Sequence, residues 1–368
     1  MRGICVHLKI NMEKLFINKV VILDGRPNAV ISRKNLKPED YGGRSKAGCS
    51  EILNITRPHL IGSLHLDYLE AGADIIRTNS FGGNEHFLSQ FALTHKAQEI
   101  NRAACRVAKE AARRFSSKGS PRFVAGNIGC DICPHFVPGR FPFSKLVATF
   151  FNHALPLLEE GADLLFLEEC RHTLTTKAAI CGIHEAFAIL GKTVPLIVSA
   201  TVENGGTMAG GQSVEAFYAS ISHANFLLFG LHSKEGPEAL AEPLRKITEI
   251  STSRIGMWAD LAPVLKKEPQ KISTSRFASE MKRVAGTQCP AALGGGEGVT
   301  PEHIKKVFEL FHEKKPAQAK RARLRLLAGK KLLNIDLETK PIVVGERANI
   351  SGSRQFRTLV YEEKFGEA

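Results

Sequence analysis

Two stretches far apart in the chain repeat one pattern: Tyr68-Leu-Glu-Ala-Gly-Ala-Asp-Ile-Ile76 and Leu157-Leu-Glu-Glu-Gly-Ala-Asp-Leu-Leu165. In each, the end of an amphipathic helix is followed by a glycine suited to the left-handed conformation that closes a helix. A short apolar run comes next, as is typical of a strand buried in a parallel sheet. A helix followed closely by a buried strand is the repeating step of an α/β fold.

The same order of elements recurs along the whole chain and predicts eight strands. They are Val20–Leu23, Asp74–Ile76, Phe123–Ala125, Leu164–Leu167, Leu196–Val198, Leu227–Leu231, Ile255–Trp258 and Ala291–Leu293. The helical patterns between them include Ala97–Arg114, Phe143–Glu159, Val214–His223, Glu238–Ile250 and Pro301–Glu313. Eight alternating units predict an α/β protein, a (β/α)₈ TIM-type barrel over residues 15–315, with a short basic C-terminal extension.

The extension divides into two parts. Residues 316–340 are expected to be a basic linker, and the pattern from Lys314 to Lys340 is helical. The segment from Pro341 to Gly352 has the pattern of a new strand that ends in a polar turn. Because few residues follow Gly352, we expect the chain to be a fragment of something longer.

The composition limits the class of protein. With 368 residues, 43% of them hydrophobic and 24% charged, the chain falls in the ordinary globular range. Fifty Lys and Arg against 37 Asp and Glu give a net charge of +13. The excess is spread along the chain without a nucleic-acid-binding motif, so a solvated basic face is expected and nucleic-acid binding is not.

Two further classes are excluded by the sequence. No charge-free apolar stretch reaches the roughly 20 residues that a membrane-spanning helix needs. Eight cysteines are too few for a disulfide scaffold in a chain of this length. We therefore expect no membrane association and a cytoplasmic location.

Polar residues follow the predicted strands, where the active site of this fold is found. They include Asp24, Gly25, Asn79, Asn127, Glu168, Ser199, His232 and the glycine-rich run Gly294–Gly298. These residues should converge at one mouth of the barrel. Glu168 ends a buried strand there, where a carboxylate could bind the ammonium group of an amino acid.

Several motifs occur in an order that identifies a known family. They are Val21-Ile-Leu-Asp-Gly25, Glu51-Ile-Leu-Asn-Ile-Thr-Arg-Pro58, Glu70-Ala-Gly-Ala-Asp-Ile-Ile76, Thr78-Asn-Ser-Phe-Gly82, Gln212-Ser-Val-Glu-Ala-Phe217 and Gly236-Pro237. Together they resemble the homocysteine-binding module at the N-terminus of cobalamin-dependent methionine synthase. The run Val344-Gly-Glu-Arg-Ala-Asn-Ile-Ser-Gly352 looks like the start of the methyltetrahydrofolate-binding barrel that follows it. On this resemblance, residues 341–368 hold the first strand of a truncated pterin-binding domain.

The resemblance implies a methyltransferase. The module would bind homocysteine, hold its thiol as thiolate on zinc, and pass it a methyl group from methylcobalamin carried by another module. Asp24, Gly25, Asn79, Glu168 and Ser199 match residues that hold the amino-acid part of homocysteine. The folate- and cobalamin-binding modules would then be supplied by separate chains.

The three zinc-ligand cysteines of the family are replaced in this chain. Ser233, Gly296 and Glu297 stand at their positions, and Arg77 replaces the Glu that usually precedes Thr-Asn. None of the family cysteines is therefore retained as a metal ligand.

Three explanations stay open. A metal site could be rebuilt with His232 and Glu297, together with a third group from elsewhere. A metal site could instead be relocated to Cys130, Cys133 and Cys170, with His232 as a fourth ligand. Alternatively, the module could be a noncatalytic scaffold or assembly module derived from the enzyme.

Overall fold

The computed structural model describes residues 12–130, 141–203, 206–261, 273–318, 324–335, 341–342 and 349–367. The chain divides into two compact units. The first contains Met1–Arg323 and Leu327–Leu333, and the second contains Leu324–Leu326 and Asn334–Ala368. The predicted site residues described below all lie in the first unit.

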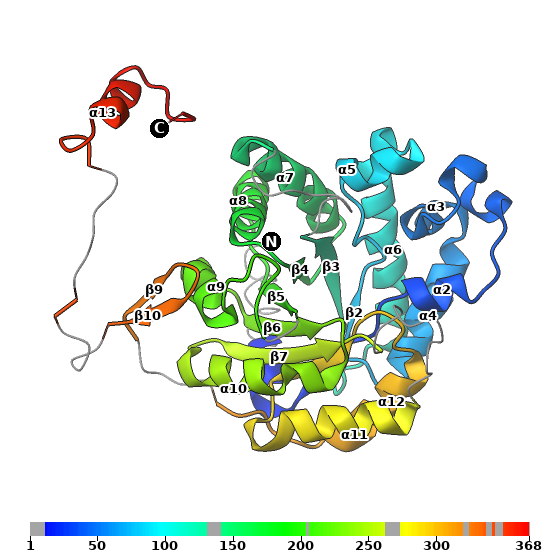
Figure 1. Ribbon diagram of the computed structural model, residues 1–368. Helices are drawn as coiled ribbons and strands as arrows, with labels where there is room; N and C mark the ends of the chain where they lie inside the picture. The colour runs from blue at the N-terminus through cyan, green and yellow to red at the C-terminus, as the bar shows by residue number, and fades with distance from the viewer. Residues whose placement is uncertain are drawn as a thin grey trace. The chain divides into compact units, whose positions relative to one another are not determined.

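The first unit contains a parallel eight-stranded sheet curled into a barrel, with helices packed around it (Figure 1). The strands are β1 (Val21–Ile22), β2 (Ile75–Arg77), β3 (Phe123–Gly129), β4 (Leu164–Cys170), β5 (Leu196–Val202), β6 (Leu228–Ser233), β7 (Arg254–Ala259) and β8 (Ala292–Gly295). Their hydrogen-bonded order is β1-β8-β7-β6-β5-β4-β3-β2. One parallel bridge, Leu23 to Ile75, joins β1 to β2 and closes the ring. The predicted α/β barrel and its eight strands are confirmed.

The helices alternate with the strands. They are α2 (Asn28–Ser32), α3 (Leu53–Thr56), α4 (Pro58–Glu70), α5 (Glu85–Leu88), α6 (Ala97–Phe115), α7 (Phe143–Glu159), α8 (Thr173–Leu190), α9 (Val214–Ile221), α10 (Ala241–Ile250), α11 (Thr274–Ala285) and α12 (Pro301–Phe311). Helix α7 has the predicted bounds, while α9 and α12 end about two residues earlier than predicted. The predicted helix Glu238–Ile250 is a 3₁₀ turn, Pro237–Leu240, that continues into α10.

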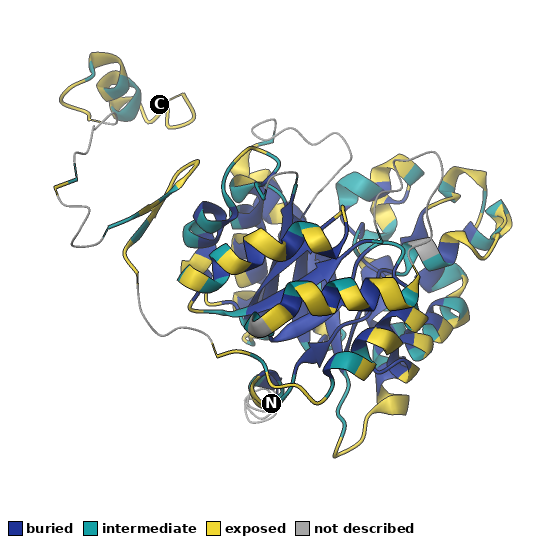
Figure 2. Cartoon of the chain, turned by 60° about the horizontal axis from the view of Figure 1, so that its bottom comes forward, coloured by how far each residue is buried: buried dark blue, intermediate teal, exposed yellow. Residues whose placement is uncertain are grey.

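The core has two layers, because successive side chains of a strand point to opposite sides. Inside the barrel, Phe123, Phe166 and Trp258 belong to one apolar cluster. Outside it, Val124, Leu165 and other alternate residues pack against the helices. Figure 2 shows the result: buried strands at the centre, and helices that are buried on the inner side and exposed on the outer side. Residues 12–18 are helical, and Met12 and Phe16 join the inner cluster.

The repeated motif has one structural explanation in both copies. Gly72 and Gly161 have left-handed φ angles of 101° and 84° after α4 and α7. Asp74 Oδ2 accepts a hydrogen bond from the Ile22 amide at 3.0 Å, and Asp163 Oδ2 accepts one from the Val124 amide at 2.8 Å. Each aspartate therefore joins its own strand to a neighbouring strand at the N-terminal end of the barrel.

The C-terminal extension differs from the expectation. The segment from Lys314 to Lys340 is expected to be a linker or an outer helix, and its described residues contain no helix beyond α12 but two short paired strands, β9 (Leu326–Ala328) and β10 (Leu332–Asn334). The basic run Lys320–Arg323 and most of the predicted strand after Pro341 lie outside the described residues. In the second unit, Ser353 caps helix α13 (Arg354–Tyr361). Among the described residues, we find no helix with the length and apolar character needed to cross a membrane.

Candidate functional site at the barrel mouth

Charged side chains replace apolar ones as the strands approach their carboxyl ends. Ile75, Phe166 and Trp258 point inward and belong to the apolar cluster. The next inward position, two residues further along each of these three segments, is held by Arg77, Glu168 and Asp260, respectively. His232 stands two residues beyond Gly230 in the same way. All four are buried. The alternation of the strands therefore gathers a polar layer at the mouth.

Arg77 lies at the centre of this layer and is 1% exposed. Its Nε donates to Asp24 Oδ1 at 2.8 Å, and its Nη1 donates to Glu168 Oε1 at 2.6 Å. Its Nη2 donates at 2.7 Å to the backbone oxygens of Asp24 and Gly295. One guanidinium thus holds together the ends of β1, β2, β4 and β8.

A second arginine stands beside it. Arg26 Nε lies 3.2 Å from Glu168 Oε1, and its Nη2 lies 2.6 Å from Glu169 Oε1. The same guanidinium stacks on the Phe81 ring at 4.3 Å. Lys234 forms a further ion pair with Glu169 at 2.9 Å. The cations therefore come from the carboxyl ends of three different strands, β1, β2 and β6.

Two consecutive acids face this mouth because β4 is irregular at its end. The register with β5 shifts between Leu167 and Cys170. Glu169 takes the left-handed conformation, with φ at 55°, which is uncommon for a residue with a side chain. In a regular strand the side chain next to Glu168 would point to the outside. Here both carboxylates reach Arg26.

The ionisation of the carboxyl groups follows from these contacts. Burial raises the pKa of Asp24 to about 6, although Arg77 partly opposes the shift. Burial also acts against ionisation of Glu168 and Glu169. Arg26 nevertheless holds both pKa values below the usual range, together with Arg77 for Glu168 and with His232 for Glu169. Glu168 Oε2 is buried and has no hydrogen-bond partner among the described residues. An unpaired carboxylate oxygen here is suited to an ammonium group.

On the other side of the mouth, His232 pairs with Asp260. His232 Nε2 lies 2.8 Å from Asp260 Oδ1, and its Nδ1 lies 3.3 Å from Thr201 Oγ1. Asp260 Oδ1 also accepts the Glu297 amide at 2.6 Å. Burial raises the pKa of the Glu297 carboxyl.

The five predicted substrate residues occupy different surroundings. Asp24 and Glu168 lie together around Arg77, and Gly25 lies where an added Cβ would be 2.3 Å from the Val299 oxygen. Asn79 Nδ2 instead donates to the Ser50 oxygen at 2.8 Å. Ser199 Oγ accepts the Trp258 indole N–H at 2.7 Å. The structure thus brings Asp24, Gly25 and Glu168 to the mouth, while Asn79 and Ser199 have hydrogen-bond partners within the fold.

The predicted metal-ligand sets are divided between two environments. His232 lies at the mouth with both ring nitrogens near other side chains. Cys130 and Cys170 lie in the apolar layer outside the strands, and Cys133 falls outside the described residues. Burial and the neighbouring Cys130 raise the pKa of Cys170, which favours the neutral thiol over a metal-binding thiolate.

The fit to zinc can be tested on this donor set. Within the described ranges, no group of three His, Cys, Asp or Glu side chains is placed to hold a metal ion. The Glu168 and Glu169 carboxylates form ion pairs with Arg26, Arg77 and Lys234 instead. The described residues therefore do not fit a zinc site, and no chemical step is assigned to one.

Sequence reasoning did not select several residues of the mouth: Arg26, Arg77, Thr201, Lys234 and Asp260. The signal for two of them was present. Arg77 and Asp260 stand two positions after the inward apolar residues Ile75 and Trp258. Counting in steps of two along each strand would have placed both at the mouth.

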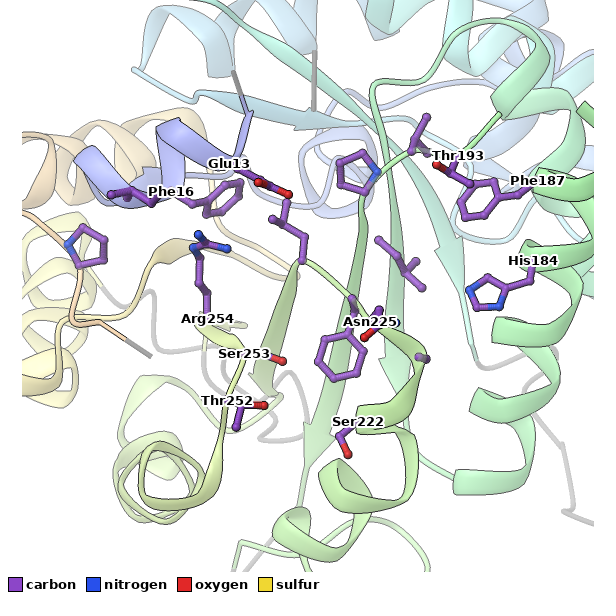
Figure 3. Close-up of a pocket in the computed structure, with 18 of the residues that line it drawn as sticks. Glu13, Phe16, His184, Phe187, Thr193, Ser222, Asn225, Thr252, Ser253 and Arg254 are labelled. Atoms are coloured by element: carbon purple, nitrogen blue, oxygen red, sulfur yellow. The ribbon is translucent and has the colours of Figure 1, made fainter. Parts of the chain in front are cut away.

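A cavity of about 1410 Å³ opens at the opposite end of the barrel (Figure 3). Leu196, Leu227 and Arg254 line it, at or beside the first residues of β5, β6 and β7. Active sites of this fold lie at the carboxyl ends of the strands. The buried ionisable groups described above also lie there, so the mouth is the better candidate site.

Comparison with known proteins assigns the barrel to a family. The homocysteine S-methyltransferase family matches residues 21–311, which include the whole barrel. Among solved structures, the oxidized form of the homocysteine methyltransferase MmuM from Escherichia coli is similar, with a TM-score of 0.64 and 15% identity over 79% of this chain and 96% of that one. Its metallated form has a TM-score of 0.63 and 16% identity over the same shares. The structural likeness shows a shared fold, and the family match shows that this chain belongs to the homocysteine S-methyltransferase family.

Proposed function

We propose that the chain is the homocysteine-binding module of a methionine synthase, with the substrate held at the barrel mouth. The family assignment supports homocysteine as the substrate. The observation that carries the proposal is Glu168 Oε2 at the end of β4, which is buried and has no hydrogen-bond partner in the part of the chain that the structure describes. Methylcobalamin on another module is the methyl donor implied by the sequence resemblance, and the folate- and cobalamin-binding modules would be partner chains. A cytoplasmic location completes the proposal.

Glu168 would bind the ammonium group of homocysteine. Its Oε1 is already held by Arg77 and Arg26, so the carboxylate is fixed before the substrate arrives. The lowered pKa keeps it ionised at neutral pH. Asp24, Gly25, Asn79 and Ser199 are proposed to shape the same site, through the backbone and side-chain contacts given above. Preorganisation of this kind reduces the entropy lost on binding.

Ionisation of the homocysteine thiol is the step that the residues of the mouth support least. A free thiol has a pKa near 8.5 and is mostly protonated at pH 7. Among the described residues, the mouth holds five carboxyl groups, Asp24, Glu168, Glu169, Asp260 and Glu297, against the three cations Arg26, Arg77 and Lys234. An excess of carboxyl groups disfavours a nearby thiolate. We therefore expect homocysteine binding with slow methyl transfer.

A second candidate is a noncatalytic scaffold or assembly module. The observation in its favour is Arg77, which stands where the family has Glu and already pairs with Asp24 and Glu168. Asp24 and Glu168 are already paired with a cation of the chain itself and so have less need of the ammonium group of a bound amino acid. Ligand binding separates this candidate from the first.

Calorimetry with homocysteine tests the proposal, and Glu168→Gln is the decisive variant. Loss of a charge-assisted bond of about 2 kcal/mol predicts roughly 30-fold weaker binding. Circular dichroism and thermal unfolding check that the variant is folded. Homoserine lacks the thiol, so Glu168→Gln should weaken homoserine binding by the same factor as it weakens homocysteine binding. A folded wild-type chain that binds no homocysteine would leave the scaffold as the better function.

Methionine formation from homocysteine and added methylcobalamin tests the chemistry. If the thiol is activated only by ionisation in solution, the rate should rise between pH 7 and 9 as the thiolate accumulates. A rate that is high and independent of pH over this range would show that the protein itself lowers the thiol pKa.

A further inference from the structure

One carboxylate joins three strand ends at the mouth. Asp260, which follows β7, accepts hydrogen bonds on Oδ1 from His232 at the end of β6 and from the Glu297 amide after β8. Its own amide donates to the Ser233 oxygen at 2.9 Å. The Gly296 amide donates to the Ala259 oxygen at 2.8 Å. The segments that carry Ser233, Gly296 and Glu297 are therefore held together without a metal.

The same carboxylate leaves no room for a side chain at Gly296. A Cβ added there would lie 2.0 Å from Asp260 Oδ1 and 2.9 Å from His232 Nε2. Heavy atoms without a covalent bond do not approach so closely. A cysteine at this position, which the sequence resemblance gives as a zinc ligand, is therefore incompatible with the His232–Asp260 pair.

The atoms of the pair that could bind a metal ion already have other partners. The two ring nitrogens of His232 face Asp260 and Thr201. Burial acts against ionisation of Asp260, but His232 and Arg26 keep its pKa below the usual range, so the carboxylate is charged and paired. A metal ion would have to break these bonds before it found a ligand.

We propose that the His232–Asp260 pair replaces a metal ion as the link between the ends of β6, β7 and β8, and that the mouth works without zinc. His232 and Asp260 are positioning residues in this proposal. They fix the loop Gly294–Gly298 and thereby the wall of the site. That the mouth binds homocysteine without zinc rests on the proposed function, whereas the statement that the mouth does not bind zinc is independent of it.

The first experiment measures zinc in the full chain after washing with a chelator and re-equilibration with zinc chloride. We expect much less than one zinc per chain, and we expect Tm to be the same with zinc and with chelator. One zinc per chain with a Tm that depends on zinc would overturn the proposal. Homocysteine binding is measured by calorimetry with zinc and with chelator. If it is absent under both conditions, the proposed function fails, while the zinc content and Tm still decide whether the mouth binds zinc.

The second experiment tests the steric argument. Gly296→Ala should lower Tm strongly or prevent folding, and the same change should be milder in an Asp260→Ala background. Gly62→Ala in α4 is the matched control, because its added Cβ would be 3.7 Å from the nearest atom, Val107 Cγ1. If Gly296→Ala is as mild as Gly62→Ala, the crowding at Gly296 is refuted.

The third experiment uses a readout that a merely structural role would not change. The triple variant Ser233→Cys, Gly296→Cys, Glu297→Cys should remain without bound zinc or fold poorly. Adding Asp260→Ala to it should produce a folded chain that binds about one zinc ion, as expected for three thiolates with an open fourth position. Equal zinc binding by both variants would show that Asp260 does not exclude the metal.

Discussion

The two ends of the barrel are joined by different kinds of contact. At the N-terminal end, apolar side chains fill the interior, and Asp74 and Asp163 each tie two strands together through one amide. At the mouth, a network of buried charges around Arg77 does the same. A buried apolar layer tolerates changes in detail, but a buried charge depends on each of its partners. The difference predicts that single substitutions at the mouth have the larger effects.

The largest effect is expected for Arg77→Met. It leaves Asp24 and Glu168 buried without their main partner, and breaking a buried pair in this way costs about 3–5 kcal/mol. Unfolding in urea measures the change. Arg276→Met on α11 is the control, because this arginine is 65% exposed and its ion pair among the described residues is with Glu280 across one helical turn. Similar losses from both variants would contradict the central role of Arg77.

The opposite end should respond less. Asp74→Ala removes the acceptor of the Ile22 amide and the partner of Lys19 and Arg122, and we expect it to lower the free energy of unfolding by about 2 kcal/mol. Asp163→Ala, which affects fewer partners, should cost less. Urea unfolding of both variants is the measurement. A loss from Asp74→Ala equal to that from Arg77→Met would remove the contrast between the two ends.

Ser199 tests where the mouth ends and the interior begins. Ser199→Ala removes the acceptor of the Trp258 indole and should lower the unfolding free energy by about 1 kcal/mol. If Ser199 is only part of the interior, the homocysteine affinity measured by calorimetry will not change. Weaker homocysteine binding with unchanged stability would place Ser199 in the substrate site.

The smallest effect is a dependence on pH. Asp24 has a pKa of about 6 in the folded chain and its usual value of 3.8 when unfolded, so protonation favours the folded state. Its contribution is fully present below pH 3.8 and is lost as the pH rises through 6. Relative to Asp24→Asn, the wild type should therefore gain roughly 1 kcal/mol of stability between pH 7 and pH 5. Urea unfolding at these two pH values measures the difference, and a gain in the other direction would contradict the raised pKa.

The fold could be predicted because its signals are local and repeated. Each strand is a short apolar run after a helix, and the glycines at 72 and 161 mark where helices end. Asp24 and Glu168 could be selected for a similar reason, since each stands at the end of an apolar strand. The partners of these groups come from distant parts of the chain, such as Arg26 for Glu168, and no local pattern specifies them.

Cys170 illustrates a second limit of sequence reasoning. Counted in steps of two from Phe166 and Glu168, it should point into the barrel, as the hypothesis of a relocated metal site requires. The register shift in β4 reverses the alternation after Glu168, and Cys170 pairs with Ala200 in the outer apolar layer. An irregularity of one residue thus changes the side of every residue that follows.

The seam between β1 and β2 gives the barrel an intrinsic place to open. Leu23 and Ile75 form a bridge there, the one that the described residues show between these strands, and the carboxylates of Asp74 and Asp24 accept the Ile22 and Arg77 amides on either side of it. Side chains therefore replace part of the backbone ladder along this line. The Ile22 and Arg77 amides should therefore be protected from hydrogen exchange only as long as they stay bonded to the Asp74 and Asp24 carboxylates. Local opening of the barrel should begin where those carboxylates are released.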